Sequence, residues 1–190
     1  MLDYLRDSAA IYARSFEIIR GEADFSQLPE DARGIATRII HACGMPEITA
    51  DLRISESFCA AARKAQVIIV DAEMVRHGII DKSLNVICTL NDTGPVSGTT
   101  RSAAAVALWR PHLEGALVVI GNAPTALFAL LEMLDAGGPR PAAIVGFPVG
   151  FVGAADSKDE LHRNPRGIPY ATLLGRKGGS AMAAAVVNAL

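Results

Sequence analysis

Five short apolar runs, each followed by a turn and then by residues with helical spacing, constrain this sequence more than any other feature. The runs are rich in aliphatic residues, are too short for helices, and are typical of strands buried on both faces. They comprise residues 67–70, 86–90, 117–120, 142–145 and 170–174. Because helices separate successive strands, we expect the strands to run parallel in one sheet. The sequence therefore predicts a single α/β domain over residues 1–190, a doubly wound, mainly parallel sheet of about five strands flanked by helices.

The composition agrees with this architecture. Hydrophobic residues make up 51% of the chain but aromatic residues only 5%, so aliphatic side chains must fill most of the core. Such a core suits helices that pack on a parallel sheet. With 190 residues, the chain is long enough to bury a sizeable core as one domain.

Charge, hydropathy and cysteine content exclude several classes of protein. The formal net charge of −2 gives no general attraction for nucleic acid or for an anionic membrane surface. No apolar run approaches the ~20 residues that cross a bilayer, and residues 1–8 lack the layout of a signal peptide. Cys43, Cys59 and Cys88 are odd in number and widely spaced, which disfavours a disulfide framework or a cysteine metal site. We therefore expect a cytoplasmic protein that binds neither nucleic acid nor membrane.

The glycine-rich turns do not match the usual nucleotide or metalloenzyme motifs. The sequence contains no Walker A loop, dinucleotide fingerprint, nucleophile elbow or zinc helix. The turn at 175–180 fits either a carboxylate site, with Arg176 or Lys177, or a tight strand-to-helix connection. Asp71 and Glu73 follow the first apolar run, where they fit a metal-ligand pair or, for Asp71, a helix cap. We predict a ligand pocket that uses neither metal nor cofactor.

One amphipathic helix carries the most suggestive polar residues. Its apolar residues follow three-and-four spacing and comprise Ala32, Ile35, Ala36, Ile39, Ile40 and Cys43. Pro29 marks its entry and Gly44 its exit. Arg38 and His41 are three residues apart and share a face beside the apolar stripe. His41 lies in the last turn, where the helix dipole favours its protonated form, so it fits an acid–base group or a capping side chain.

Two further helices are expected from their caps. The first runs over residues 8–22, with Asp7 or Ser8 as its cap, and the other runs from Ser55 to about Arg63.

Two loop regions offer contacts for a ligand. A helix that begins after Thr100 places Arg101 in its first turn, where the dipole disfavours a cation, so an external carboxylate is favoured as its partner. The turn at 121–125 exposes backbone amides at the start of another helix. The loop at 146–153 is too apolar for a phosphate and suits a flat apolar ligand surface.

Seven segments, taken together, resemble the precorrin-8X methylmutase family. In chain order they are residues 11–16 (Ile-Tyr-Ala-Arg-Ser-Phe), 38–44 (Arg-Ile-Ile-His-Ala-Cys-Gly), 71–74, 100–104 (Thr-Arg-Ser-Ala-Ala), 120–126, 149–158 and 178–182. The resemblance implies an isomerase of cobalamin (corrin) biosynthesis that moves a methyl group from C-11 to C-12 of precorrin-8X, giving hydrogenobyrinate. It also implies the same fold, a corrinoid (tetrapyrrole) substrate, no cofactor, and a homodimer with the pocket near the subunit interface.

The resemblance also assigns roles to residues. The family's catalytic histidine falls on His41, and its substrate-binding serine and arginine fall on Ser15 and Arg38. Arg101 matches the arginine of the Thr-Arg-Ser-Ala segment, and two further residues are predicted as substrate contacts, Asn122 and Lys158. A [1,5]-sigmatropic methyl shift consumes no redox equivalent and no external methyl donor. His41 as imidazolium would donate a proton to the macrocycle and recover it after migration.

Two other functions remain open at this point. One is the same rearrangement on a cobalt-containing substrate, which these residues do not distinguish from the metal-free reaction. The other is a non-catalytic tetrapyrrole carrier that binds the product and hands it on. An unrelated α/β enzyme acting on small acids is a weaker alternative.

Overall fold

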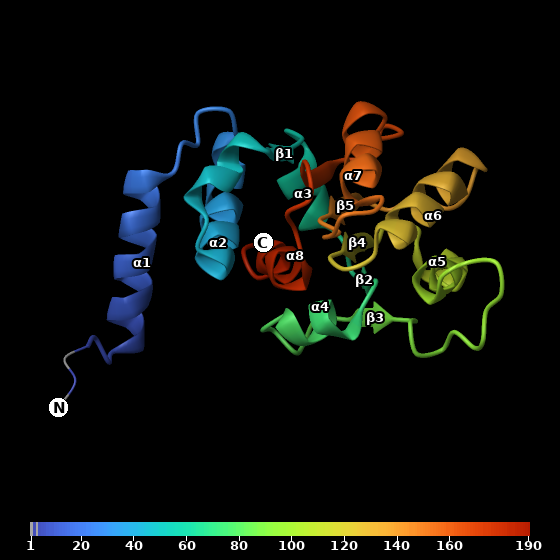
Figure 1. Ribbon diagram of the computed structural model, residues 1–190, viewed down its shortest axis with the longest axis horizontal. Helices are drawn as coiled ribbons and strands as arrows, with labels where there is room; N and C mark the ends of the chain where they lie inside the picture. The colour runs from blue at the N-terminus through green and yellow to red at the C-terminus, as the bar shows by residue number, and fades with distance from the viewer. Residues whose placement is uncertain (1, 3) are drawn as a thin grey trace.

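A six-stranded sheet forms the centre of the protein in a computed structural model that describes residues 2 and 4–190 (Figure 1). The strand order is β1-β6-β5-β4-β2-β3, and all neighbours are parallel except β1, which pairs antiparallel with β6. The strands are β1 (Leu52–Ile54), β2 (Ile68–Val70), β3 (Val86–Cys88), β4 (Leu117–Ile120), β5 (Ala143–Gly146) and β6 (Tyr170–Leu173). The predicted α/β class and the parallel strands are confirmed, and β1 is an additional strand that its three residues gave no pattern to reveal.

Helices cover both faces of the sheet. They are α1 (Ser8–Glu22), α2 (Arg33–Cys43), α3 (Phe58–Ala62), α4 (Glu73–Gly78), α5 (Arg101–Ala107), α6 (Pro124–Asp135), α7 (Ala154–Arg163) and α8 (Ser180–Val187). Short 3₁₀ turns add η1 (Glu30–Ala32), η2 (Pro46–Ala50) and η3 (Arg110–His112). None of the helices within the described residues is long and apolar enough to cross a bilayer.

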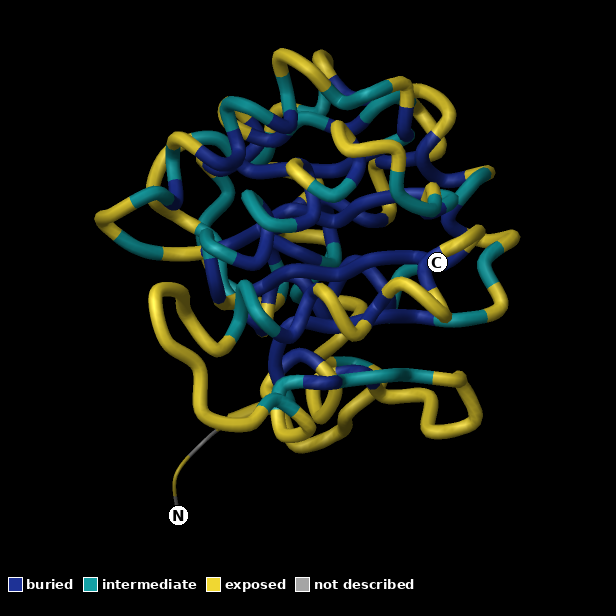
Figure 2. The backbone as a smooth tube through the Cα atoms, turned by 90° about the vertical axis from the view of Figure 1, so that its right-hand side faces the viewer, coloured by how far each residue is buried: buried dark blue, intermediate teal, exposed yellow. Residues whose placement is uncertain are grey.

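The alternation of side chains along the strands divides the core in two. Val70 and Val119 point towards α2, α4 and α8, whereas Ile69 and Val118 point towards α5 and α6. Figure 1 shows α1, α2 and α8 on one flank of the sheet and α5, α6 and α7 on the other. The strands β2, β4, β5 and β6 are buried at the centre, the edge strands β1 and β3 are less so, and the exposed segments lie around the periphery (Figure 2). This three-layer arrangement is the doubly wound fold.

The topological switch point lies between β2 and β4. The chain passes from β2 to β3 on one side and then crosses back to β4 on the other, and sheets of this kind bind ligands beyond such a point. Here Asp71 follows β2, and its carboxylate accepts the backbone N–H groups of Gly121, Asn122 and Ala123 at 2.9, 2.9 and 2.8 Å. Burial raises the pKa of the Asp71 carboxyl, while the three donors act in the opposite direction by stabilising the anion. Asp71 thus anchors the turn after β4 instead of capping α4.

The segment after β1 differs from the sequence expectation. Ser55 was expected to cap a helix, but its Oγ accepts the backbone N–H of Tyr170 at 2.9 Å, and α3 begins only at Phe58. The hydroxyl therefore joins the end of β1 to β6. Sequence pattern alone could not anticipate this bond because the two residues are far apart in the chain.

Helix α1 lies outermost in the fold. It covers the predicted residues, and Asp7 caps it by accepting the N–H of Ala10 at 2.7 Å. Ile19 is its one buried residue in the described chain, and α2 is its main neighbour. A helix with so little burial depends on the few contacts that it makes with α2.

Candidate active site

His41 lies in the last turn of α2, as the sequence predicted. Gly44 ends the helix in the left-handed conformation with φ 69°, and its N–H bonds to the carbonyl of Ile40. The imidazole is turned towards α1, where its Nδ1 lies 2.8 Å from the Oγ of Ser15. The hydroxyl bonds Nδ1 in either protonation state, and Nε2 is then the nitrogen available to a ligand. The structure therefore brings His41 and Ser15 together.

Two aromatic side chains of α1 enclose the same imidazole. The ring of Tyr12 is tilted by 33° over it with centroids 4.9 Å apart, and Phe16 contacts it edge-on at 5.4 Å. Sequence reasoning assigned neither residue to the site. Their spacing could have indicated a place beside Ser15, because positions 12, 15 and 16 lie on one face of a helix.

Arg38 lies one helical turn before His41 but does not share its cavity. Its guanidinium carbon is 5.2 Å from the centroid of the Tyr12 ring, so that ring contacts both Arg38 and His41. His41 and Ser15 line a cavity of about 430 Å³ between α1 and the start of η2. Arg38 lines a second cavity of about 560 Å³ with Arg63.

Arg101 and Asn122 lie beyond the carboxyl ends of the strands, on the side of α5 and α6. Thr100 caps α5, and the Arg101 guanidinium donates to the carbonyl of Leu90 at 3.2 Å. Asn122 has an exposed side chain, while its N–H is held by Asp71. No contact joins either residue to His41 within the described chain, so their substrate contacts remain predictions.

Lys158 is fully buried and donates to the carbonyl of Lys177 at 2.5 Å. Burial lowers the pKa of its ammonium to about 8. Lys177 in turn forms an ion pair with Glu47 of η2 at 3.0 Å, which ties the turn at 175–180 to the segment after His41. In this position Lys158 supports a turn, and its role as a substrate contact remains a prediction.

The turn at 175–180 makes a close connection between β6 and α8. Gly178 has φ 155°, and a Cβ there would lie 2.4 Å from the carbonyl oxygen of Phe147, so no side chain fits. Gly179 donates to the same carbonyl at 2.8 Å. These contacts satisfy the tight-connection interpretation, and the carboxylate site proposed from the sequence is untested.

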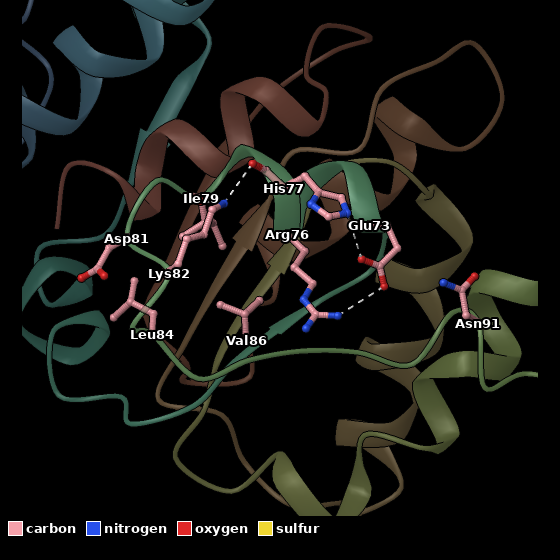
Figure 3. A pocket seen from close by; sticks show the side chains of 9 residues that line it. All are labelled: Glu73, Arg76, His77, Ile79, Asp81, Lys82, Leu84, Val86 and Asn91. Carbon is pink, nitrogen blue, oxygen red and sulfur yellow. Dashed lines mark hydrogen bonds and ion pairs between the residues drawn. The ribbon is translucent and has the colours of Figure 1, made fainter.

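A third cavity, of about 670 Å³, is lined by charged residues near the edge strand β3 (Figure 3). In Figure 3 the carboxylate of Glu73 faces Arg76 and His77, which lie 3.6 and 3.7 Å from its oxygens. These contacts join neighbouring turns of α4, and at least half of the Arg76 and His77 side chains is exposed. Within the described part of the chain, no three His, Cys, Asp or Glu side chains gather as metal ligands.

Comparison with known proteins gives one consistent result. The family model described as precorrin-8X methylmutase matches residues 10–190. A Pseudomonas aeruginosa protein named precorrin-8X methylmutase is 55% identical, covering 100% of this chain and 98% of its own. A Sinorhizobium protein of the same name is 53% identical, over 99% and 96% of the two chains. Relatives named cobalt-precorrin-8 methylmutase are 30–38% identical.

A solved structure shows the same fold. The crystal structure of a precorrin-8X methylmutase from Thermus thermophilus superposes with a TM-score of 0.84 at 34% identity. It covers 96% of this chain and 94% of that one.

Proposed function

This chain belongs to the precorrin-8X methylmutase family and is an isomerase of cobalamin biosynthesis; on that premise we propose that His41 is its proton-transfer group. The reaction proposed is migration of a methyl group from C-11 to C-12 of precorrin-8X. The observation that carries the proposal is the 2.8 Å contact between Ser15 Oγ and His41 Nδ1. The contact orients the ring and leaves Nε2 as the nitrogen that can face a ligand.

The proton transfer follows from that geometry. A sigmatropic shift needs the conjugated macrocycle in its reactive tautomer, which a proton on the ring system favours. His41 donates the proton from Nε2 and takes it back once the methyl group has moved, so the enzyme returns to its starting state. A positioned acid–base group of this kind contributes about 10²–10⁴ in rate.

The rest of the catalytic effect is assigned to positioning. The substrate carries several carboxylate side chains, and Arg38 and Arg101 are the proposed partners for two of them, as charge-assisted pairs. Asn122 and Lys158 are proposed as further contacts. Holding the macrocycle at a fixed place relative to Nε2 lowers the entropic part of the barrier.

Metal-free precorrin-8X is the proposed substrate, because the relatives of 53–55% identity carry that name and those named for the cobalt form are 30–38% identical. We expect kcat/KM to be about tenfold higher on metal-free precorrin-8X than on cobalt-precorrin-8. Turnover is followed by the visible spectrum of the product. Equal or higher kcat/KM on the cobalt substrate would contradict the assignment, and binding without turnover of either would favour the carrier.

We also propose that the enzyme is a homodimer formed through α1. Ile11 and Ile18 of α1 are each 43% exposed, and Leu5, just before the helix, is 52% exposed, which makes an unusual gathering of large apolar side chains along α1. The same three residues line the cavity that contains His41. A partner copy seated on α1 would cover these side chains and close the cavity.

Ile18→Glu is the test of this interface. A buried, unpaired carboxylate is unfavourable, so the variant should be a monomer by light scattering where the unaltered chain is a dimer. Leu108→Glu is the matched control, because Leu108 is 42% exposed but lies on the opposite flank at the end of α5. A monomeric unaltered chain, or an Ile18→Glu dimer, would count against the proposal.

A further inference from the structure

We propose that Tyr12 is a positioning residue for this reaction, because its ring contacts both Arg38 and His41. The inference rests on the function proposed above. It concerns a residue to which neither the sequence motifs nor the comparisons assign a role.

Helix α1 supplies three of the side chains that surround the imidazole. Tyr12, Ser15 and Phe16 are spaced so that they lie on the face of α1 turned to α2. Ser15 bonds Nδ1, Phe16 contacts the ring at its edge, and Tyr12 is tilted over one face. Phe16 and Tyr12 also contact each other, with centroids 5.8 Å apart at 72°. Rotation of the imidazole is thus restricted by three neighbours, of which Tyr12 covers the face.

Tyr12 also contacts the guanidinium of Arg38. The guanidinium of Arg38 lies 5.2 Å from the ring centroid, within the range of cation–π attraction. Arg38 lines one cavity and His41 another, and the ring of Tyr12 is the contact shared by the two side chains.

This arrangement fixes the separation of two groups that act on different parts of one ligand. The proposed substrate carries carboxylates at its rim and receives a proton at its ring system. Arg38 can hold a carboxylate while Nε2 reaches the ring only if both side chains keep a set separation. The rigid ring of Tyr12 maintains it, and a flexible aliphatic side chain does not.

The test compares Y12L with Y12F. Y12L should lower kcat and raise KM, each about tenfold, because it releases both the Arg38 guanidinium and the His41 imidazole. Y12F keeps the ring and should restore both constants to within about threefold of the unaltered enzyme. Y4L is the matched control, since Tyr4 is 61% exposed and its ring carries Arg6 at 4.3 Å, yet it has no contact with His41 in the described chain. Both constants should be unchanged in Y4L.

A double-mutant cycle with R38A separates positioning from a general loss of structure. Once Arg38 is removed, Y12L should no longer change KM but should still lower kcat. The imidazole protons of His41 give a spectroscopic signature, because the Tyr12 ring shields them in the unaltered protein and in Y12F. Y12L should remove that shielding in the NMR spectrum. If Y12L does not fold, Y12M replaces it in the same cycle.

The outcomes distinguish this inference from the function on which it rests. Unchanged kcat and KM in Y12L, with H41A inactive, would overturn the role of Tyr12 and leave the proposed function standing. A cycle in which the KM effects of Y12L and R38A simply add would overturn it as well. Full activity in H41A would instead remove the proposed function.

Discussion

Replacing His41 with alanine should lower kcat by about 10²–10⁴-fold while leaving the fold intact, because it removes the proton donor and nothing that the core requires. The imidazole is half-buried between α1 and α2, with its Nδ1 on Ser15. Its loss leaves the Ser15 hydroxyl near an open cavity, where water can replace the bond. Single-turnover assays on precorrin-8X measure the chemical step directly.

The matched control for this variant is His112→Ala. His112 is an exposed histidine in η3, on the flank of α5, so the change of residue type is the same but the site is remote. We expect His112→Ala to keep full activity, and both variants to have unchanged circular dichroism spectra. Comparable turnover in His41→Ala and the unaltered enzyme would remove His41 from the mechanism.

Replacing Asp71 with alanine should destabilise the protein by about 3–5 kcal/mol, because three backbone N–H groups, in two buried hydrogen bonds and one partly buried one, lose a shared carboxylate acceptor. Asp71 is 3% exposed, and the donors belong to the turn after β4, fifty residues or more along the chain. No water can enter easily, since Gly121 is so closely packed that a Cβ would lie 2.8 Å from Ala183. For a chain of this length the midpoint of thermal unfolding should fall by roughly 10 °C.

Asp71→Asn, a milder change at the same position, and Asp24→Ala, a change at an exposed aspartate, are the controls for this prediction. The amide of asparagine keeps one acceptor oxygen, so the stability of Asp71→Asn should lie between that of Asp71→Ala and that of the unaltered protein. Asp24 accepts a backbone N–H from Ser26 at 2.8 Å but is exposed, so Asp24→Ala should change stability by no more than ~0.5 kcal/mol. Chemical denaturation measures the free energy of unfolding of all three variants. A loss of less than ~1 kcal/mol in Asp71→Ala would show that the turn does not depend on the carboxylate.

The buried strands and the long helices could be predicted because their signals are local. The apolar run at 117–120 forms β4 over the predicted residues, and α1 matches its predicted bounds with Asp7 as its cap. Gly44 ends α2 for a reason that is also local, its positive φ. Strand β1 escaped prediction because three residues carry too short a pattern and depend on pairing with β6.

The candidate site was predictable in part. The position of His41 followed from helical periodicity, and its likeness to a family motif selected it among the histidines. The contact with Ser15 is consistent with the family motif, but its distance required the packing of α1 on α2. The contacts of the Tyr12 ring with Arg38 and His41 could not be predicted from the spacing of these residues. They depend on the orientations of three side chains, which the packing of α1 on α2 sets.

The sequence by itself determined the alternation of strands and helices, the ends of the main helices and the identity of the candidate proton donor. The first two depend on patterns within a few residues, such as apolar periodicity and cap residues, whereas the choice of His41 rests on the resemblance to a family. Only the tertiary structure decided that Asp71 holds the turn after β4, that Lys158 is buried beneath another turn, and that the Tyr12 ring contacts both Arg38 and His41. These outcomes depend on contacts between distant residues, and chain packing sets them through side-chain direction and burial.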